Sequence, residues 1–292
     1  MTTTLQCVGA SSLSLSTPSS YYSTGNRGVG TTGWGACSRI VVEGFDLSGV
    51  SADSLVSATL GIYQTIGGQP ATFGNATVHR LQRTNAVVAE MCWYRYKTGS
   101  DWGTWGAANT TTDIDSANSA TYAGDWTEYN LWRDIDVTDQ VLDAIALGTE
   151  YGCRVSQATE TDGTSNYLNF TVSGDNRPRL VLVFAAEVVS ASAPSNTTVN
   201  VQFSAAIDAT TANDESKWTI TRDEGGAVPG FTCTLQGDPT VVQIVFDTPL
   251  DGHYTIEATN VLDDTGHALN PTADTAYVAV LAGTRRAQGW VF

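Results

Sequence analysis

The chain of 292 residues carries 14 basic and 30 acidic residues, and its net charge of −16 disfavours nucleic acid as a partner, because phosphate is repelled. Its apolar runs stay short of the roughly 18 residues that span a membrane, so we expect no membrane insertion. Only 15% of the residues are charged, and Thr, Ser, Asn and Gly are abundant, which favours strands and turns over helices. The composition therefore predicts a soluble all-β protein.

Alternation of apolar and polar residues predicts a series of strands in the first part of the chain. The segments are RIVVEGFDL, SATLGIYQT, ATVHRLQ, DIDVTDQVL, YGCRVSQ, YLNFTVS and RLVLVF. One short helix is expected from Asp136 onward, with Thr138 as its N-terminal cap. Its apolar face would be formed by Val141, Leu142 and Ile145.

After Phe184 a second set of strands is predicted, whose spacing is typical of a small antiparallel sandwich. The charge changes at the same place, since residues 187–280 carry 2 basic and 13 acidic residues. We therefore expect one domain over residues 1–186, a second over residues 187–280, and a C-terminal tail over residues 281–292.

Four stretches of the first domain carry a resemblance to a known family. They are SRIVVEGFDLSGVSADSLVSATLGIY, VAEMCWYRYKTGSDWGTWGA, DIDVTDQVLDAIALGTEYGCRVS and YLNFTVSGDNRPRLVLVF. In order and spacing they resemble the disaggregatase-related repeat, or DNRLRE domain, over about residues 20–184. Met91-Cys92-Trp93 departs from the Val-Thr-Trp that is usual there. The resemblance implies a jelly-roll-like β-sandwich, similar to carbohydrate-binding modules, on extracellular proteins that are mostly not catalysts.

The second domain resembles bacterial Ig-like domains of the surface-layer type. The matching stretches are VNVQFSAAIDATTANDESKWTI and HYTIEATNVLDDTGHALNP, with the turn from Asp263 to Leu269 the most recognisable part. Such domains serve as spacers and adhesion units, so the resemblance implies an Ig-like β-sandwich with that kind of role.

The tryptophan-rich segment WYRYKTGSDWGTWGA, residues 93–107, has two interpretations. In the resembled repeat this loop is a fixture of the fold, which implies that Trp93, Trp102 and Trp105 cover one end of the sandwich. Aromatic side chains bury large areas and hold loops in place. In the alternative, Trp102, Trp105, Tyr94 and Trp126 form a platform on which a glycan stacks.

Sites for metals and catalysis are weakly indicated. Asp113 and Asp115, together with Asp101, could hold a structural calcium ion through their oxygen atoms, or they could serve simple turn chemistry. No other cofactor is predicted. The motif Gly28-Val-Gly-Thr-Thr-Gly33 precedes a predicted strand where a dinucleotide site needs a helix. The three histidines lie at neither metal nor triad spacing, so we expect no enzyme.

The five cysteines are odd in number and lack CxxC spacing, which predicts buried free thiols and folding in a reducing compartment. The N-terminus has neither a basic region nor a continuous apolar region of a secretory signal, so a signal has been removed or the protein leaves its cell by another route.

The tail LAGTRRAQGWVF combines two arginines with apolar residues on an acidic chain. We expect it to dock onto a neighbouring subunit through Arg285, Arg286, Trp290, Val291 and Phe292, and the alternative is that it folds back onto its own domain.

These features together predict a non-enzymatic structural subunit of an extracellular assembly. The expected setting is a bacteriophage virion, as a decoration, fibre or tail-associated protein that folds in the host cytoplasm. Its partners would be further copies of itself, other structural proteins of the assembly, and cell-surface glycans. The alternative is a carbohydrate-binding module of a secreted or cell-surface protein.

Overall fold

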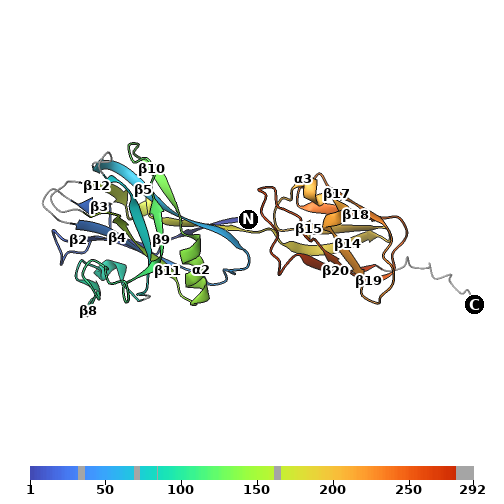
Figure 1. Ribbon diagram of the computed structural model, residues 1–292, viewed down its shortest axis with the longest axis horizontal. Coiled ribbons are helices and arrows are strands. Elements are labelled where there is room, and N and C mark those ends of the chain that lie inside the picture. Colours follow the sequence, from blue (N-terminus) through green and yellow to red (C-terminus); the bar gives the residue numbers. More distant parts are fainter. Residues whose placement is uncertain (32–36, 69–72, 84, 161–165, 281–292) are drawn as a thin grey trace, which may run out of the picture. The chain divides into compact units, whose positions relative to one another are not determined.

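A computed structural model describes residues 1–31, 37–68, 73–83, 85–160 and 166–280 (Figure 1). It divides into two compact units, one of residues 2–183 and one that begins at Phe184 and also includes Met1. This division lies close to the boundary expected after Ala186. Both units are built from antiparallel strands, and the prediction of an all-β protein is confirmed.

The first unit is a jelly-roll-like β-sandwich in which all described strands except one short hairpin form one antiparallel hydrogen-bonded network. Its strands are β1 (Thr2–Gln6), β2 (Gly9–Ser14), β3 (Asn26–Thr31), β4 (Cys37–Phe45), β5 (Leu55–Gly68), β6 (Ala76–Leu81), β7 (Arg95–Lys97), β8 (Ser100–Asp101), β9 (Ile114–Tyr122), β10 (Leu131–Asp136), β11 (Tyr151–Gln157), β12 (Asn166–Thr171) and β13 (Arg179–Phe184). The order is β1-β13-β5-β12-β3-β4-β11-β6-β9, with β10 paired to β5 and β2 paired to β4, while β7 and β8 form a separate hairpin. Short helices are η1 (Val88–Glu90), α2 (Thr138–Ala146) and η2 (Gly174–Asn176).

The core of the first unit lies between its strands and α2. Phe45 of β4 stacks on Tyr151 of β11, with ring centroids 6.0 Å apart, and both rings are fully buried. The Tyr151 hydroxyl donates to the side chain of Gln140 on α2 at 2.9 Å, which satisfies the polar end of this buried ring. Each such apolar side chain contributes about 1.5–3 kcal/mol when fully buried.

The predicted helix is present, and its beginning differs from the expectation. Thr138 is its first residue and not its cap, because the backbone N–H and the hydroxyl of Thr138 both donate to Asp136. On the predicted apolar face Val141 is fully buried, while Leu142 and Ile145 are half-buried.

The second unit is an Ig-like β-sandwich of two sheets. Its elements are β14 (Val188–Ser195), β15 (Thr198–Phe203), β16 (Thr219–Arg222), β17 (Phe231–Leu235), β18 (Val241–Phe246), β19 (Gly252–Glu257), β20 (Thr275–Val280), α3 (Ala209–Ala212) and η3 (Glu215–Lys217). A four-stranded sheet, β14-β15-β18-β17, faces a three-stranded sheet, β16-β19-β20, as in Ig-type sandwiches (Figure 1). Alternate residues point inward, among them Val199 and Val201 of β15, Ile244 of β18 and Ile256 of β19. The buried indole of Trp218 donates to the carbonyl of Ala212 at 3.1 Å.

Four of the five cysteines are buried free thiols, as predicted: Cys7, Cys92, Cys153 and Cys233. Burial raises the pKa of Cys7 to about 11 and the pKa values of Cys153 and Cys233 to about 12. These three side chains therefore stay protonated and unreactive at neutral pH. Cys37 is half-buried.

The residues of the predicted docking tail, Arg285, Arg286, Trp290, Val291 and Phe292, lie outside the described residues. No helix in the described part of the chain has both the length and the hydropathy needed to cross a membrane.

Candidate functional site

The tryptophan-rich segment forms a loop that packs on the first unit. Part of it joins residues of β2, β4 and β6 in a second apolar cluster, which comprises Leu13, Val41, Leu81, Met91, Trp93, Trp102, Ala107 and Ile114. Trp93 is 6% exposed and Trp102 is 4% exposed. The interpretation of the loop as a cover over the sandwich is thus confirmed for these two residues.

The backbone of the loop is closed by hydrogen bonds around the two buried rings. The indole N–H of Trp102 donates to the carbonyl of Cys92 at 3.0 Å. The backbone N–H of Trp102 donates to the carbonyl of Tyr94, also at 3.0 Å. Gly106 has a φ of 75°, and a Cβ there would lie 2.8 Å from the ring of Trp93. Only glycine fits this position, because both the left-handed backbone and the close approach of the indole exclude a side chain.

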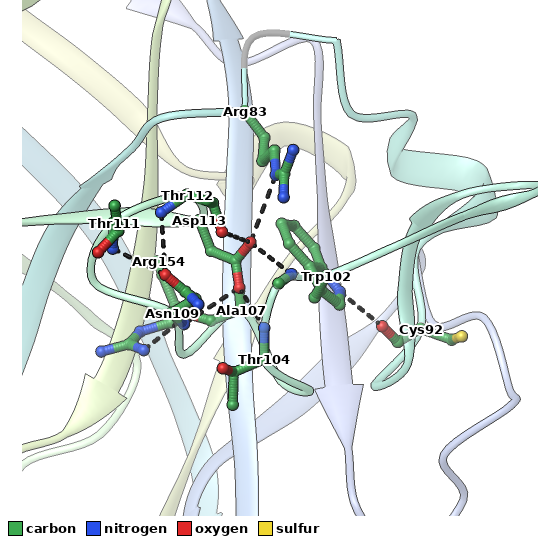
Figure 2. Close-up of polar contacts among 11 residues, drawn as sticks. Arg83, Cys92, Trp102, Thr104, Ala107, Asn109, Thr111, Thr112, Asp113 and Arg154 are labelled. Carbon is green, nitrogen blue, oxygen red and sulfur yellow. Dashed lines mark hydrogen bonds and ion pairs between the residues drawn. The ribbon is translucent and has the colours of Figure 1, made fainter.

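A single buried carboxylate organises the other half of the loop (Figure 2). Asp113 is fully buried, and its two oxygens accept backbone N–H bonds from Gly103 at 2.8 Å, Thr104 at 3.0 Å and Asn109 at 3.1 Å. The guanidinium of Arg83 lies 3.3 Å from the same carboxylate. Charge-assisted bonds of this kind are about twice as strong as neutral ones, so Asp113 fixes the path of residues 103–109.

This geometry matches turn chemistry for Asp113, which was the alternative to the predicted calcium site. The oxygens of Asp113 face N–H donors and an arginine, which leaves them no free direction toward a cation. Asp115 pairs instead with Arg80 at 2.7 Å, and a backbone hydrogen bond from Ala117 together with Arg80 lowers the pKa of Asp115. Asp101 is exposed on β8. Within the described residues, no group of three or more His, Cys, Asp and Glu side chains is placed to hold a metal ion.

Two arginines of the sheet donate hydrogen bonds to carbonyl groups of the loop. Arg154 of β11 donates to the carbonyl of Ala107 at 2.8 Å, and Arg39 of β4 donates to the carbonyl of Gly106 at 2.6 Å. Arg39 also pairs with Glu160 and lies over the Trp93 ring at 5.1 Å. His79 contacts Arg154 at 3.1 Å, and burial together with Arg154 lowers the pKa of His79 to about 4. The imidazole is therefore neutral at physiological pH and adds no charge to this cluster.

The loop leaves one aromatic pair at the surface. Trp105 is 59% exposed, so the expectation that it belongs to the buried cover is wrong. Its ring meets that of Tyr94 edge to face, with centroids 4.8 Å apart and an interplanar angle of 66°. Tyr94 is half-buried and packs on the second apolar cluster. This pair is the exposed part of a loop that is otherwise fixed by Trp102 and Asp113.

Two of the four residues expected to stack on a glycan do not offer an open ring face. Trp102 belongs to the second apolar cluster, as described above. Trp126 is 3% exposed, its indole donates to the carbonyl of Gly74 at 2.7 Å, and it packs against Phe73 and Tyr122. Burial removes both from a platform, whereas Trp105 is exposed and Tyr94 is half-buried.

The chain matches no protein-family model and no curated protein, so the resemblance to the disaggregatase-related repeat gains no support from a family model. Solved structures similar to part of the chain include the N-terminal part of the bacterial S-layer protein SbsC, at 19% identity and a TM-score of 0.30. The match covers 33% of this chain and 24% of that one. A structure of SbsC domains 1–6 matches 34% of this chain at 18% identity, covers 14% of its own length and has a TM-score of 0.31.

A third similar structure is β-1,2-glucanase from Parabacteroides distasonis, at 8% identity and a TM-score of 0.26. Here the match covers 90% of this chain and 33% of the enzyme. The chain thus spans at most about a third of the length of these proteins. TM-scores this low carry no conclusion about function.

Proposed function

We propose that this protein is a non-catalytic structural subunit of an extracellular assembly, and that its first unit adheres to a surface glycan through Trp105 and Tyr94. The observation that carries the proposal is the contrast within one loop, where Trp105 is 59% exposed while Trp102 is 4% exposed. The loop is held by buried groups and presents an aromatic pair outward.

Such an arrangement suits recognition because the loop is ordered before a ligand binds. Binding usually costs about 0.5–1.5 kcal/mol for each flexible side chain that is immobilised. The edge contact between Trp105 and Tyr94, together with the hydrogen bonds of Asp113, reduces this cost. Tryptophan and tyrosine also dominate the energetics of interfaces, since they bury large areas and carry one polar group each.

The setting that we propose is a bacteriophage virion. Buried thiols support it, because Cys7 and Cys153 lie in the first unit and Cys233 in the second, with pKa values of about 11 to 12 that keep them protonated. A protein with such thiols suits folding in a reducing cytoplasm followed by release on lysis. Mass spectrometry of purified particles from the source organism tests this setting, and absence from every particle would exclude it.

A second candidate is a carbohydrate-binding module of a secreted or cell-surface protein, which the same exposed pair favours. The two candidates share the glycan contact and differ in the assembly. A chain that binds glycans but is found in no particle would be such a module.

The adhesion contact is tested with a glycan array probed by the full chain and by Trp105→Ala and Tyr94→Ala variants. Tyr21→Ala is the matched control, because Tyr21 is also in the first unit and is 47% exposed. We expect at least tenfold weaker binding for Trp105→Ala and unchanged binding for Tyr21→Ala, with all variants folded by circular dichroism. Equal binding by Trp105→Ala and the unmodified chain would overturn the contact.

A further inference from the structure

A cavity of about 590 Å³ lies in the first unit, and neither Trp105 nor Tyr94 is among the described residues that line it. This volume is within the range of small-molecule sites, roughly 300–1,000 Å³. One part of its wall is apolar and comes from Val8, Leu81 and residues 86–89. Val8 is 79% exposed and Val87 is 39% exposed, so apolar surface is open to solvent at this place.

An irregularity of the sheet shapes the polar part of the cavity. Along β4 and β11, Tyr151 pairs with Phe45 and Cys153 pairs with Val42, so that Glu43 and Gly44 together oppose Gly152. This is a β-bulge, and Gly44 has the positive φ, 78°, that such bulges favour. Bulges redirect side chains, and all three bulge residues line the cavity.

Glycine keeps this part of the cavity open. A Cβ on Gly152 would lie 3.4 Å from the Cγ of Glu43 and 3.3 Å from Leu81, and a Cβ on Gly44 would lie 2.5 Å from Val8. Larger residues would press on the side chains that line the wall.

The carboxylate of Glu43 has an unsatisfied atom here. Its Oε1 is buried and accepts no hydrogen bond from any described residue. A buried acceptor without a partner costs about 1–3 kcal/mol, more when the group is charged. The pKa of Glu43 is raised to about 8, mainly by burial and to a smaller extent by the nearby charge of Glu150. A ligand that donates to Glu43 would remove both penalties.

The charges around the cavity determine which ligand fits. Glu43, Glu150 and Arg83 line it. Arg83 already pairs with Asp113 and lies over the ring of Tyr96 at 4.9 Å.

Two other titratable groups on the surrounding elements have partners of their own. Glu90 of η1 accepts from the backbone of Thr98 at 2.8 Å, and the Tyr151 hydroxyl donates to Gln140. When Glu43 is ionised, its carboxylate and that of Glu150 outnumber the one cation, Arg83, among the described residues that line this partly apolar cavity.

We propose that this cavity is a binding site for a small organic cation, a primary ammonium group on an aliphatic body. The ammonium would donate to Glu43 and lie between its carboxylate and that of Glu150. The aliphatic body would cover Val8, Leu81 and Val88. Once the cation displaces the proton of Glu43, it lies between two carboxylates beside an apolar wall, which is complementary to this chemistry, and the charge of Glu150 disfavours carboxylate ligands.

The test is isothermal titration calorimetry of the full chain with three probes of similar shape: pentylammonium, pentanol and hexanoate. We expect pentylammonium to bind at least tenfold more tightly than the other two. Glu43→Gln and Glu150→Gln should each weaken that binding about tenfold or more, and Glu128→Gln is the matched control, since Glu128 is exposed and outside the cavity lining. Tighter binding of hexanoate would overturn the proposal, as would equal binding of all three probes.

Proton release gives a second readout that does not depend on how the variants fold. Because Glu43 is mostly protonated below pH 8, a bound cation should displace its proton at pH 7. The affinity for pentylammonium should therefore rise between pH 6 and pH 8, by at most tenfold for each pH unit, because one proton is released. Titrations in buffers of different ionisation enthalpy count the released protons. Binding of pentylammonium with no proton release by the unmodified chain would exclude Glu43 as the cation's partner.

Discussion

The two units of this protein bury very different kinds of side chain. In the described part of the first unit the buried polar residues include one aspartate, three arginines and three glutamines: Asp113, Arg80, Arg133, Arg154, Gln64, Gln140 and Gln157. In the described part of the second unit the corresponding residues are Asp263 and Asn270, and the rest of its core is apolar. The second unit is thus a sandwich closed mainly by hydrophobic packing, whereas the first uses buried charges to hold a loop.

This difference indicates where the molecule is specialised. A polar network in a core is costly unless every member has a partner, and it then fixes one arrangement of the chain. In the first unit two of these residues, Asp113 and Arg154, bond to the loop that carries Trp105 and Tyr94, while Asp263 of the second unit closes a turn through the N–H groups of Thr265 and His267. We therefore expect the first unit to make contacts and the second to act as a spacer.

The largest effect should come from removing the carboxylate of Asp113. Its loss leaves the N–H groups of Gly103, Thr104 and Asn109 and the charge of Arg83 without their acceptor. Breaking a buried ion pair from one side costs about 3–5 kcal/mol, and we expect Asp113→Ala to destabilise the first unit by that amount.

Hydrogen exchange measured by mass spectrometry separates the two units in this experiment. Protection should fall in residues 85–114 and in the first unit, while strands β14 to β20 stay as protected as before. The control is Asp125→Ala, since Asp125 is exposed and, among the described residues, bonds within its own turn to Thr127. Loss of protection in both units would show that they are not independent in stability.

The next effect concerns a tryptophan in each unit. Trp93 is 6% exposed in the first unit and Trp218 is 5% exposed in the second. Removal of a buried large aromatic costs about 3–5 kcal/mol, so Trp93→Ala and Trp218→Ala should be similarly destabilising. Each should lower only its own unit's transition in differential scanning calorimetry. An unchanged first transition for Trp93→Ala would show that the loop does not contribute to the core.

The sequence predicted the architecture well because alternation and turn residues are local signals. Strands β4, β5, β6, β11, β12 and β13 and the helix at Thr138 follow from spacing alone, whereas β9, with the sequence IDSANSATY, has little apolar alternation and was not predicted. The site was predicted less well. Asp113 appeared either as a cation ligand or as a turn residue, since a carboxylate near two others in sequence carries no sign of whether N–H groups or a metal will face it. Only the folded path of residues 103–109 decides that.

The tryptophans illustrate the same limit. Trp102 and Trp105 are three residues apart in one motif, yet the first is buried and the second is mostly exposed. The backbone turns at Gly106 and Ala107, which both have positive φ, and the pattern of residue types does not encode which ring is turned inward. The Glu43 bulge was missed for a related reason, because a shift in strand register appears only once the partners are known.

A smaller, pH-dependent effect should distinguish Glu43 from the other carboxyl groups. Its pKa is about 8 in the folded chain against an ordinary value of 4.5, so the folded state holds this proton more tightly than the unfolded state. The side chain's contribution to stability is therefore full below about pH 4.5 and is lost as the pH rises through 8. The free energy of unfolding of Glu43→Gln minus that of the unmodified chain should be larger at pH 8.5 than at pH 5, by an amount on the order of 1–3 kcal/mol. Urea unfolding of both proteins at both pH values measures this quantity, and the same value at pH 5 and pH 8.5 would contradict the assignment of the pKa.

The smallest effect on stability should come from the residue to which we assign the adhesion contact. Trp105 is 59% exposed, and its main partner is the edge of Tyr94, a contact worth about 0.5–1.5 kcal/mol at most. Trp105→Ala should therefore shift the free energy of unfolding by about 1 kcal/mol or less in urea titrations, far below Trp93→Ala. A large aromatic that contributes little to folding but sits on a loop fixed by Asp113 is the pattern expected of a contact residue. If Trp105→Ala destabilised the first unit as much as Trp93→Ala, the ring of Trp105 would belong to the core. The loop would then have no exposed aromatic residue that is free to bind a ligand.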